Sequence, residues 1–152
     1  MRLVKNNNFK DLGLQITLSI TTLVVVLDQL IKNKIHANGG FYFCNKGISF
    51  GFSFPVFIFW LSLGLLFVIS SSYYLKVLKN KQPPLFLSLG LGFFWGGVLA
   101  NSLDRLFFGC VFDYFSFLGQ SFPLFNLADI TISVGGLLLS VFLLRKNPNL
   151  SV

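Results

Sequence analysis

The chain has 152 residues, of which 54% are hydrophobic and 11% are charged, and its mean hydropathy is +0.74. Soluble domains carry about a quarter charged residues, so this composition excludes a soluble globular enzyme, and its high hydrophobicity excludes a disordered chain. Lys and Arg number 12 against five acidic residues, and every one of the five is Asp. The length leaves room for one domain of about 150 residues.

Four long apolar stretches follow one another along the chain, at about residues 12–31, 55–75, 84–103 and 125–144. A helix needs roughly 20 apolar residues to cross a bilayer, and Pro55 suits the first turn of the second helix. We therefore predict an all-α polytopic membrane protein with four transmembrane helices. Residues 1–152 would form a single membrane domain.

Two segments between the helices, at about 32–54 and 104–124, carry turn and strand signals. Gly39-Gly40 precedes Phe41–Asn45, which reads as a short strand, and an extended segment is predicted at Ile48–Phe50. Gly109–Phe115 reads as another strand or as a re-entrant piece. We expect these segments to form a small β/loop platform outside the membrane.

The distribution of Lys and Arg predicts the orientation of the helices. Eight basic residues lie on the side that holds both termini and the loop between the second and third helices, and four lie on the other side. The eight are Arg2, Lys5, Lys10, Lys76, Lys79, Lys81, Arg145 and Lys146; the four are Lys32, Lys34, Lys46 and Arg105. Both termini are thus predicted in the cytoplasm. A cleaved signal peptide is the alternative for the first stretch, but it lacks an A-x-A-like site.

On this topology four of the five acids gather at the outer membrane face, and all but Asp113 have a structural explanation beside a functional one. Asn126 and Asp129 have the spacing of a capping arrangement at the start of the fourth helix. Asp28 and Asp104 lie near helix C-termini, where the helix dipole disfavours a carboxylate. Ion pairs, of Asp28 with Lys32 and of Asp104 with Arg105, would offset that cost.

The third helix presents small and polar residues on one face. Gly92, Gly96 and Ala100 recur at intervals of four, which favours close helix packing. The same stripe continues into three polar residues, Asn101, Asp104 and Arg105. Packing alone explains the glycines. Ionisable groups at such depth are also functional candidates.

Asp113 lies in an aromatic loop that leads to Asp129. Two carboxylates brought together do not both ionise readily, so one serves as a general base for water and the other as a general acid. The competing chemistries are poorly supplied, because His36 is the only His and no phosphate-binding motif or nucleic-acid patch is present. Cys44 and Cys110 both fall on the outer side, but two cysteines are weak evidence for pairing, and unpaired thiols are favoured.

Five sequence blocks, in order between the predicted helices, together resemble the lipoprotein signal peptidase (signal peptidase II) family. They are VLDQLIK (26–32), NKGISFG (45–51), GGVLANSLDR (96–105), GCVFDY (109–114) and FPLFNLAD (122–129). The resemblance covers residues from about 26 to 130.

The resemblance implies an aspartic endopeptidase of the bacterial inner membrane, with its active site at the outer face and no metal or organic cofactor. Its substrate would be a lipid-modified prolipoprotein, cut just before the Cys that carries diacylglycerol. Asp113 and Asp129 would be the catalytic pair. The polar residues around them would be Asp28, Lys32, Asn45, Asn101, Asp104, Arg105 and Asn126. Besides its substrate, membrane lipids would be its partners, and the chain would be monomeric.

Cys44 departs from the family, which usually has Arg before the Asn of the second block, and any substrate contact of that Arg is therefore in doubt. Two other functions remain as alternatives. The Asp cluster would suit a small transporter or ion channel, although the cytoplasmic half of the helices is almost entirely apolar. A non-catalytic membrane scaffold would leave the cluster replaceable.

Overall fold

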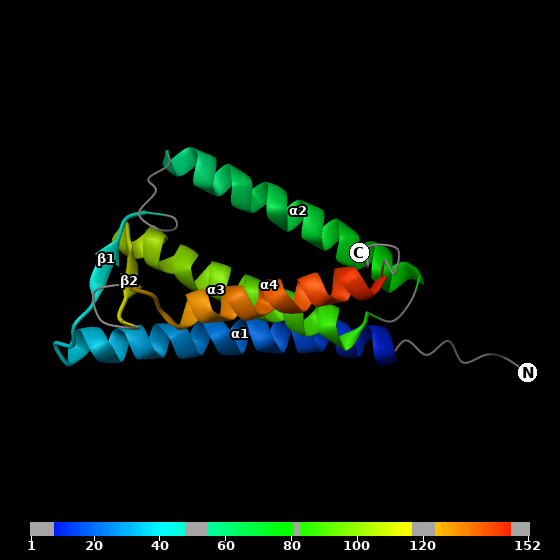
Figure 1. Ribbon diagram of the computed structural model, residues 1–152, viewed down its shortest axis with the longest axis horizontal. Helices are drawn as coiled ribbons and strands as arrows, with labels where there is room; N and C mark the ends of the chain where they lie inside the picture. The colour runs from blue at the N-terminus through cyan, green and yellow to red at the C-terminus, as the bar shows by residue number, and fades with distance from the viewer. Residues whose placement is uncertain (1–7, 48–54, 81–82, 117–123, 147–152) are drawn as a thin grey trace, which may run out of the picture.

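The computed structural model describes residues 8–47, 55–80, 83–116 and 124–146. Within these ranges the chain forms four helices and two short strands: α1 (Asn8–Ala37), β1 (Phe43–Asn45), α2 (Val56–Asn80), α3 (Leu85–Phe108), β2 (Val111–Asp113) and α4 (Leu127–Lys146). The strands lie at one end of the helices, and α1 begins and α4 ends at the opposite end (Figure 1). The predicted extended segment at Ile48–Phe50 lies outside the described residues.

Each helix contains a stretch that is long and apolar enough to cross a membrane, at Leu12–Ala37, Phe57–Lys79, Leu85–Phe108 and Leu127–Arg145. The predicted fold class is therefore confirmed. The first and third helices extend five or six residues beyond their predicted outer ends, because apolarity indicates where a helix leaves the hydrocarbon layer and not where it stops. The stop of α3 is local: Gly109 adopts a φ of 72°, a left-handed cap that favours glycine.

Helix α3 is the centre of the bundle and packs along both α1 and α4. Of its membrane stretch 56% is buried, against 6% for that of α2. The predicted glycine face meets α1: a Cβ added at Gly92 would lie 2.8 Å from Cβ of Ile20, and one at Gly96 would lie 2.7 Å from Cβ of Val24. The small residues therefore permit the close approach of the two helices.

Helix α2 lies apart from the other three in Figure 1. Its side chains nevertheless contact α3. The Trp95 indole N–H donates a hydrogen bond to Ser70 Oγ over 3.2 Å. Tyr74 packs with Leu87 and Leu91 in the hydrophobic core at the end of the bundle away from the strands. The polar site described below draws instead on α1, α3 and α4.

The two strands pair in antiparallel fashion, with Phe43 opposite Asp113, Cys44 opposite Phe112 and Asn45 opposite Val111. This register brings Cys44 within reach of Cys110, and the two form a disulfide with a Cα–Cα distance of 5.4 Å. The interpretation of these residues as unpaired thiols was wrong. The cysteines are 66 residues apart in sequence, because α2 and α3 lie between the two strands in the chain. The pairing of β1 with β2 brings them together.

Candidate active site

The N-terminus of α4 is fixed by three side chains from three parts of the chain. The backbone N–H of Leu127 donates to Tyr114 Oη over 3.2 Å, that of Ala128 to Asp28 Oδ1 over 3.0 Å, and that of Asp129 to Asn126 Oδ1 over 3.0 Å. The N–H groups of a first helical turn have no partner within the helix, so these acceptors satisfy them.

Asn126 and Asp129 also form the reciprocal half of this cap, because the Asn126 backbone N–H donates to Asp129 Oδ2 over 3.2 Å. The predicted capping arrangement is therefore confirmed. It fixes the position of the Asp129 carboxylate relative to the helix start.

Lys32 supplies one buried cation to two carboxylates. Its ammonium lies 2.6 Å from Asp28 Oδ2 and 2.7 Å from Asp104 Oδ2, and it donates to Asn101 Oδ1 over 3.1 Å. The side chains of Lys32, Asp28 and Asp104 are at most 2% exposed. Three N–H donors thus meet three acceptors.

The predicted partner of Asp28 is confirmed by this arrangement, whereas that of Asp104 is wrong. Asp104 pairs with Lys32 of α1 and not with its neighbour Arg105, because adjacent side chains point to different sides of a helix. The Arg105 guanidinium instead donates to the backbone oxygens of Asn101, over 3.3 Å, and Gly47, over 2.9 Å.

Two asparagine amides connect this ion cluster to the other carboxylates. Asn101 Oδ1 accepts hydrogen bonds from Lys32 and from Asn126, so its NH₂ group faces Asp129, to which it donates over 2.8 Å. The Asn126 NH₂ donates to Asp113 Oδ1 over 2.7 Å as well as to Asn101. Asn126 therefore contacts both Asp113, through its side chain, and Asp129, through its backbone N–H.

Asp113 receives a second amide from β1. The Asn45 NH₂ donates to Asp113 Oδ2 over 2.9 Å, while Asn45 Oδ1 accepts the backbone N–H of Gly47 and so fixes the orientation of the amide. Asp113 is only 2% exposed. Burial raises the pKa of its carboxyl above the usual value, and the charge of Asp129 raises it further, while the hydrogen bonds from Asn45 and Asn126 oppose this rise.

All nine residues predicted from the sequence therefore belong to one connected cluster. They come from α1, α3, α4, the residue that precedes α4 and both strands, and the cluster lies at the end of the bundle that carries the strands. They are Asp28, Lys32, Asn45, Asn101, Asp104, Arg105, Asp113, Asn126 and Asp129.

Sequence reasoning missed two further members. Gln29 donates to Asp104 Oδ1 over 2.7 Å, and its place beside Asp28 in the first block was the available signal. Tyr114 caps α4, and burial raises the pKa of its phenol to about 12, so the hydroxyl keeps its proton. Its place beside Asp113 gave no indication of this role.

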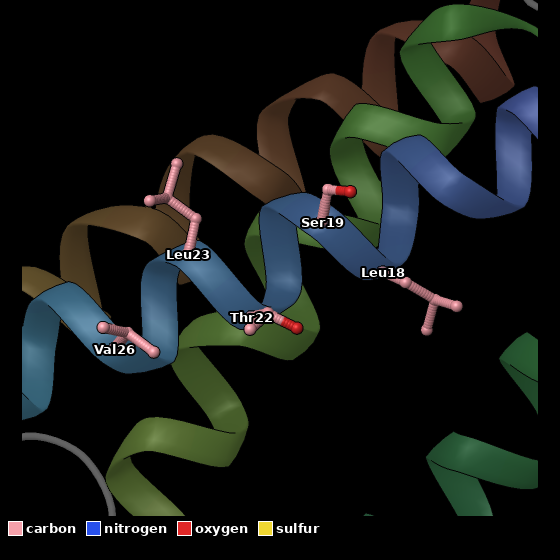
Figure 2. Close-up of a pocket in the computed structure, with 5 residues that line it drawn as sticks. All are labelled: Leu18, Ser19, Thr22, Leu23 and Val26. Atoms are coloured by element: carbon pink, nitrogen blue, oxygen red, sulfur yellow. The ribbon is translucent and has the colours of Figure 1, made fainter.

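A pocket on α1 does not contribute to the cluster. This shallow pocket is lined by Leu18, Ser19, Thr22, Leu23 and Val26 (Figure 2). Leu18, Leu23 and Val26 are about half exposed, whereas Asp28 and Lys32 of the same helix are buried, so the pocket lies on the outer surface of the bundle. Within the described ranges no group of three His, Cys, Asp or Glu side chains is placed to hold a metal ion.

The fold and the cluster define a class of protein: a four-helix membrane protein with a pair of aspartates held by amides at one end of the bundle. A solved bacterial membrane enzyme, determined by the in meso method at 2.3 Å resolution, has this fold. The two share 25% sequence identity and superpose with a TM-score of 0.70 over 89% of this chain and 91% of the other.

Residues 20–145 match the signal peptidase (SPase) II family. The lipoprotein signal peptidase of Burkholderia vietnamiensis is 36% identical over 85% of this chain and 87% of its own length. That of Anaplasma phagocytophilum is 34% identical over 85% and 92%. The chain therefore belongs to the signal peptidase II family.

Membership in this family settles the class of activity. The chain is a membrane aspartic peptidase of the signal peptidase II type, and its four membrane-spanning helices fit a protein of the bacterial inner membrane. The predicted function, removal of signal peptides from prolipoproteins, is confirmed at this level. The transporter alternative is not favoured.

Proposed function

We propose that Asp113 and Asp129 are the catalytic pair of this peptidase, and that it cuts diacylglyceryl-modified prolipoproteins just before the lipidated Cys. One observation carries the proposal: the Asn126 side chain donates to Asp113 and its backbone N–H donates to Asp129. A single residue thus holds the two carboxylates in a fixed relation. Neutral amides also position them without an ion pair, so their protons remain available for exchange.

In this mechanism the two aspartates share one proton and hold a water molecule between them. The charged carboxylate accepts a proton from the water as its oxygen attacks the scissile carbonyl carbon. The protonated carboxyl donates a hydrogen bond to the carbonyl oxygen as negative charge develops there. When the C–N bond breaks, a proton passes to the departing amine, and the pair returns to its starting state. The two protons titrate jointly.

The surrounding residues would orient this pair. Asn101 and Asn45 each donate to one carboxylate, and Lys32, Asp28 and Asp104 hold α1 against α3 and the start of α4. We propose that Arg105 fixes the segment after β1 through its hydrogen bond to the Gly47 oxygen. Because one chain supplies every proposed site residue, the enzyme would act as a monomer, in a single membrane domain of residues 1–152, with lipids around its helices.

We further propose that both termini are cytoplasmic and that the active site faces outward. Two independent observations support this orientation. The excess of Lys and Arg near the termini and in the loop between the second and third helices agrees with the positive-inside rule. The Cys44–Cys110 disulfide lies beside the site, and disulfides persist in oxidising compartments outside the cytosol.

The test is cleavage of a synthetic prolipoprotein peptide by the purified protein reconstituted in lipid. Asp113→Asn and Asp129→Asn are each expected to reduce kcat by at least about a thousandfold, because the amide that replaces one carboxyl group cannot exchange a proton with the remaining aspartate. Asp11→Asn is the matched control, since Asp11 lies in the first turn of α1 at the far end of the bundle. A peptide without diacylglycerol tests the substrate class.

Two results would contradict these assignments. Cleavage that survives in either variant, with normal membrane accumulation, would exclude the aspartate pair. Equal cleavage of the lipidated and unlipidated peptides would exclude recognition of the diacylglyceryl group.

A further inference from the structure

The disulfide lies directly beside the proposed catalytic pair. Cys44 immediately precedes Asn45, whose amide donates to Asp113, and Cys110 lies three residues before Asp113 itself. The disulfide therefore links β1, which carries the donor Asn45, to the segment that carries the acceptor Asp113.

The two strands joined by this bond are anchored very unequally. Strand β2 is buried: Cys110 and Val111 are each 2% exposed, and the Phe112 backbone N–H donates to Asp104 Oδ2 of α3. In β1, by contrast, Phe43 is 54% exposed and Cys44 is exposed. The disulfide thus fastens a poorly packed strand to a well-packed one.

The other contacts of β1 are few and polar. Its ladder with β2 spans three residues on each strand, and an isolated two-stranded pair is at best marginally stable in water. The Asn45 amide reaches Asp113, and the Gly47 oxygen accepts from Arg105. Holding the Asn45 donor on the carboxylate therefore depends on a short, exposed strand that has little apolar burial of its own.

We propose that Cys44 and Cys110 are positioning residues for the peptidase reaction: their disulfide holds the Asn45 amide on Asp113, and its reduction slows cleavage. The proposal rests on the assignment of Asp113 to the catalytic pair. Reduction needs a dithiol. One of its thiolates attacks Sγ of Cys44, and the S–S bond breaks to release the Cys110 thiolate. The second thiolate then displaces Cys44 as a thiolate and leaves the dithiol as a cyclic disulfide. Two electrons pass to the protein, and Cys44 and Cys110 each take up a proton.

The first experiment measures cleavage of the lipidated prolipoprotein peptide by the reconstituted enzyme before and after treatment with dithiothreitol. Thiols are counted in parallel by labelling with a maleimide of known mass. The oxidised enzyme is expected to show no free thiols and the reduced enzyme two. We expect kcat to fall by roughly tenfold on reduction, the factor associated with a hydrogen bond to a charged group. KM should change by less than about twofold, because the interaction lost is the Asn45 hydrogen bond to Asp113.

A pH profile separates positioning from general loosening of the fold. The Asn45 hydrogen bond lowers the pKa of Asp113, so its loss should move the acidic limb of the kcat profile to higher pH. The charged groups that face Asp113 are Asp129 of α4, Lys32 of α1 and Arg105 of α3, and reduction leaves all three in place. Partial unfolding would lower kcat at every pH without moving the limb.

Two variants give the matched controls. Cys44→Ser removes the bond at an exposed position, so it should reproduce the reduced enzyme and show no further response to dithiothreitol. Asn45→Ala keeps the disulfide but removes the donor, so it should lower kcat and move the limb as reduction does. In a double-mutant cycle, reduction of Asn45→Ala should then have little added effect, since both perturbations remove one interaction.

Several results would overturn the proposal. These are free thiols in enzyme isolated from aerobic cells, an unchanged kcat after full reduction, a response of Cys44→Ser to dithiothreitol, or an Asn45→Ala enzyme as sensitive to reduction as wild type. Cleavage that is indifferent to reduction refutes this inference alone. Absence of cleavage by the oxidised wild type would refute the proposed function together with it.

Discussion

Removal of the buried cation tests whether one ion cluster holds the bundle at its active end. We consider Lys32→Met, which keeps the length and apolar stem of the side chain. Lys32 lies 2.6 Å from an oxygen of Asp28 and 2.7 Å from one of Asp104, and all three side chains are at most 2% exposed. The substitution therefore leaves two buried carboxylates without their cation.

The size of the effect follows from these distances. At an effective dielectric constant of about 20, each contact is worth roughly 6 kcal/mol of Coulomb attraction, most of which offsets the cost of removing the charges from water. The net loss on deleting one partner of a buried pair is about 3–5 kcal/mol. For a chain of this length, each kcal/mol lost from the free energy of unfolding lowers the melting temperature by about 2–4 °C. Lys32→Met should therefore melt on the order of 10 °C below wild type.

The assay is thermal unfolding in detergent, followed by the fluorescence of the two tryptophans. Lys34→Met is the matched control, because Lys34 lies on the same helix and is exposed; its melting temperature should change by no more than a few degrees. Adding Asp104→Asn to Lys32→Met removes one of the two buried carboxylates that lack a cation. The double variant should therefore recover part of the lost melting temperature. Equal melting temperatures for the Lys32 and Lys34 variants would refute the reasoning.

Two further predictions concern the start of α4. Gly97→Ala should destabilise the protein by about 1–3 kcal/mol and lower kcat, because a Cβ there would meet Thr131 Oγ1 and the backbone oxygen of Ala128. Gly64→Ala is the control and should be neutral, since a Cβ at Gly64 would meet no atom within 4 Å. Equal melting temperatures for the two variants would contradict this packing. Tyr114→Phe leaves the first N–H of α4 without its acceptor, which should cost about 1–3 kcal/mol; an unchanged melting temperature would show that this cap contributes nothing.

The parts of the fold that could be predicted from sequence are those that local pattern determines. Apolar runs located the four helices, and the Asn126–Asp129 spacing identified a cap that the structure contains. The i,i+4 pair of Asp28 and Lys32 was likewise correct. Each of these depends on residues within one or two helical turns, which the sequence itself places side by side.

The contacts that escaped prediction join residues far apart in the chain. Asp28 caps a helix that begins about 100 residues later, and Lys32 reaches across to Asp104 of another helix. The Cys44–Cys110 bond depends on the register of two strands that are separated in the chain by two helices. No periodicity records such contacts, because they arise only when the helices pack. The sequence blocks that resemble the family brought these residues to attention without giving their partners.

The difference between the two aspartate pairs follows from the kind of donor that holds each. Asp28 and Asp104 share a full positive charge at under 3 Å, and a carboxylate so paired gives up its ion pair if it takes a proton. Asp113 and Asp129 are held by the neutral amides of Asn45, Asn101 and Asn126, each with its oxygen already occupied by another donor. Such amides orient a carboxylate in either protonation state. We therefore expect the second pair to exchange protons, while the first pair holds α1 against α3 through Lys32.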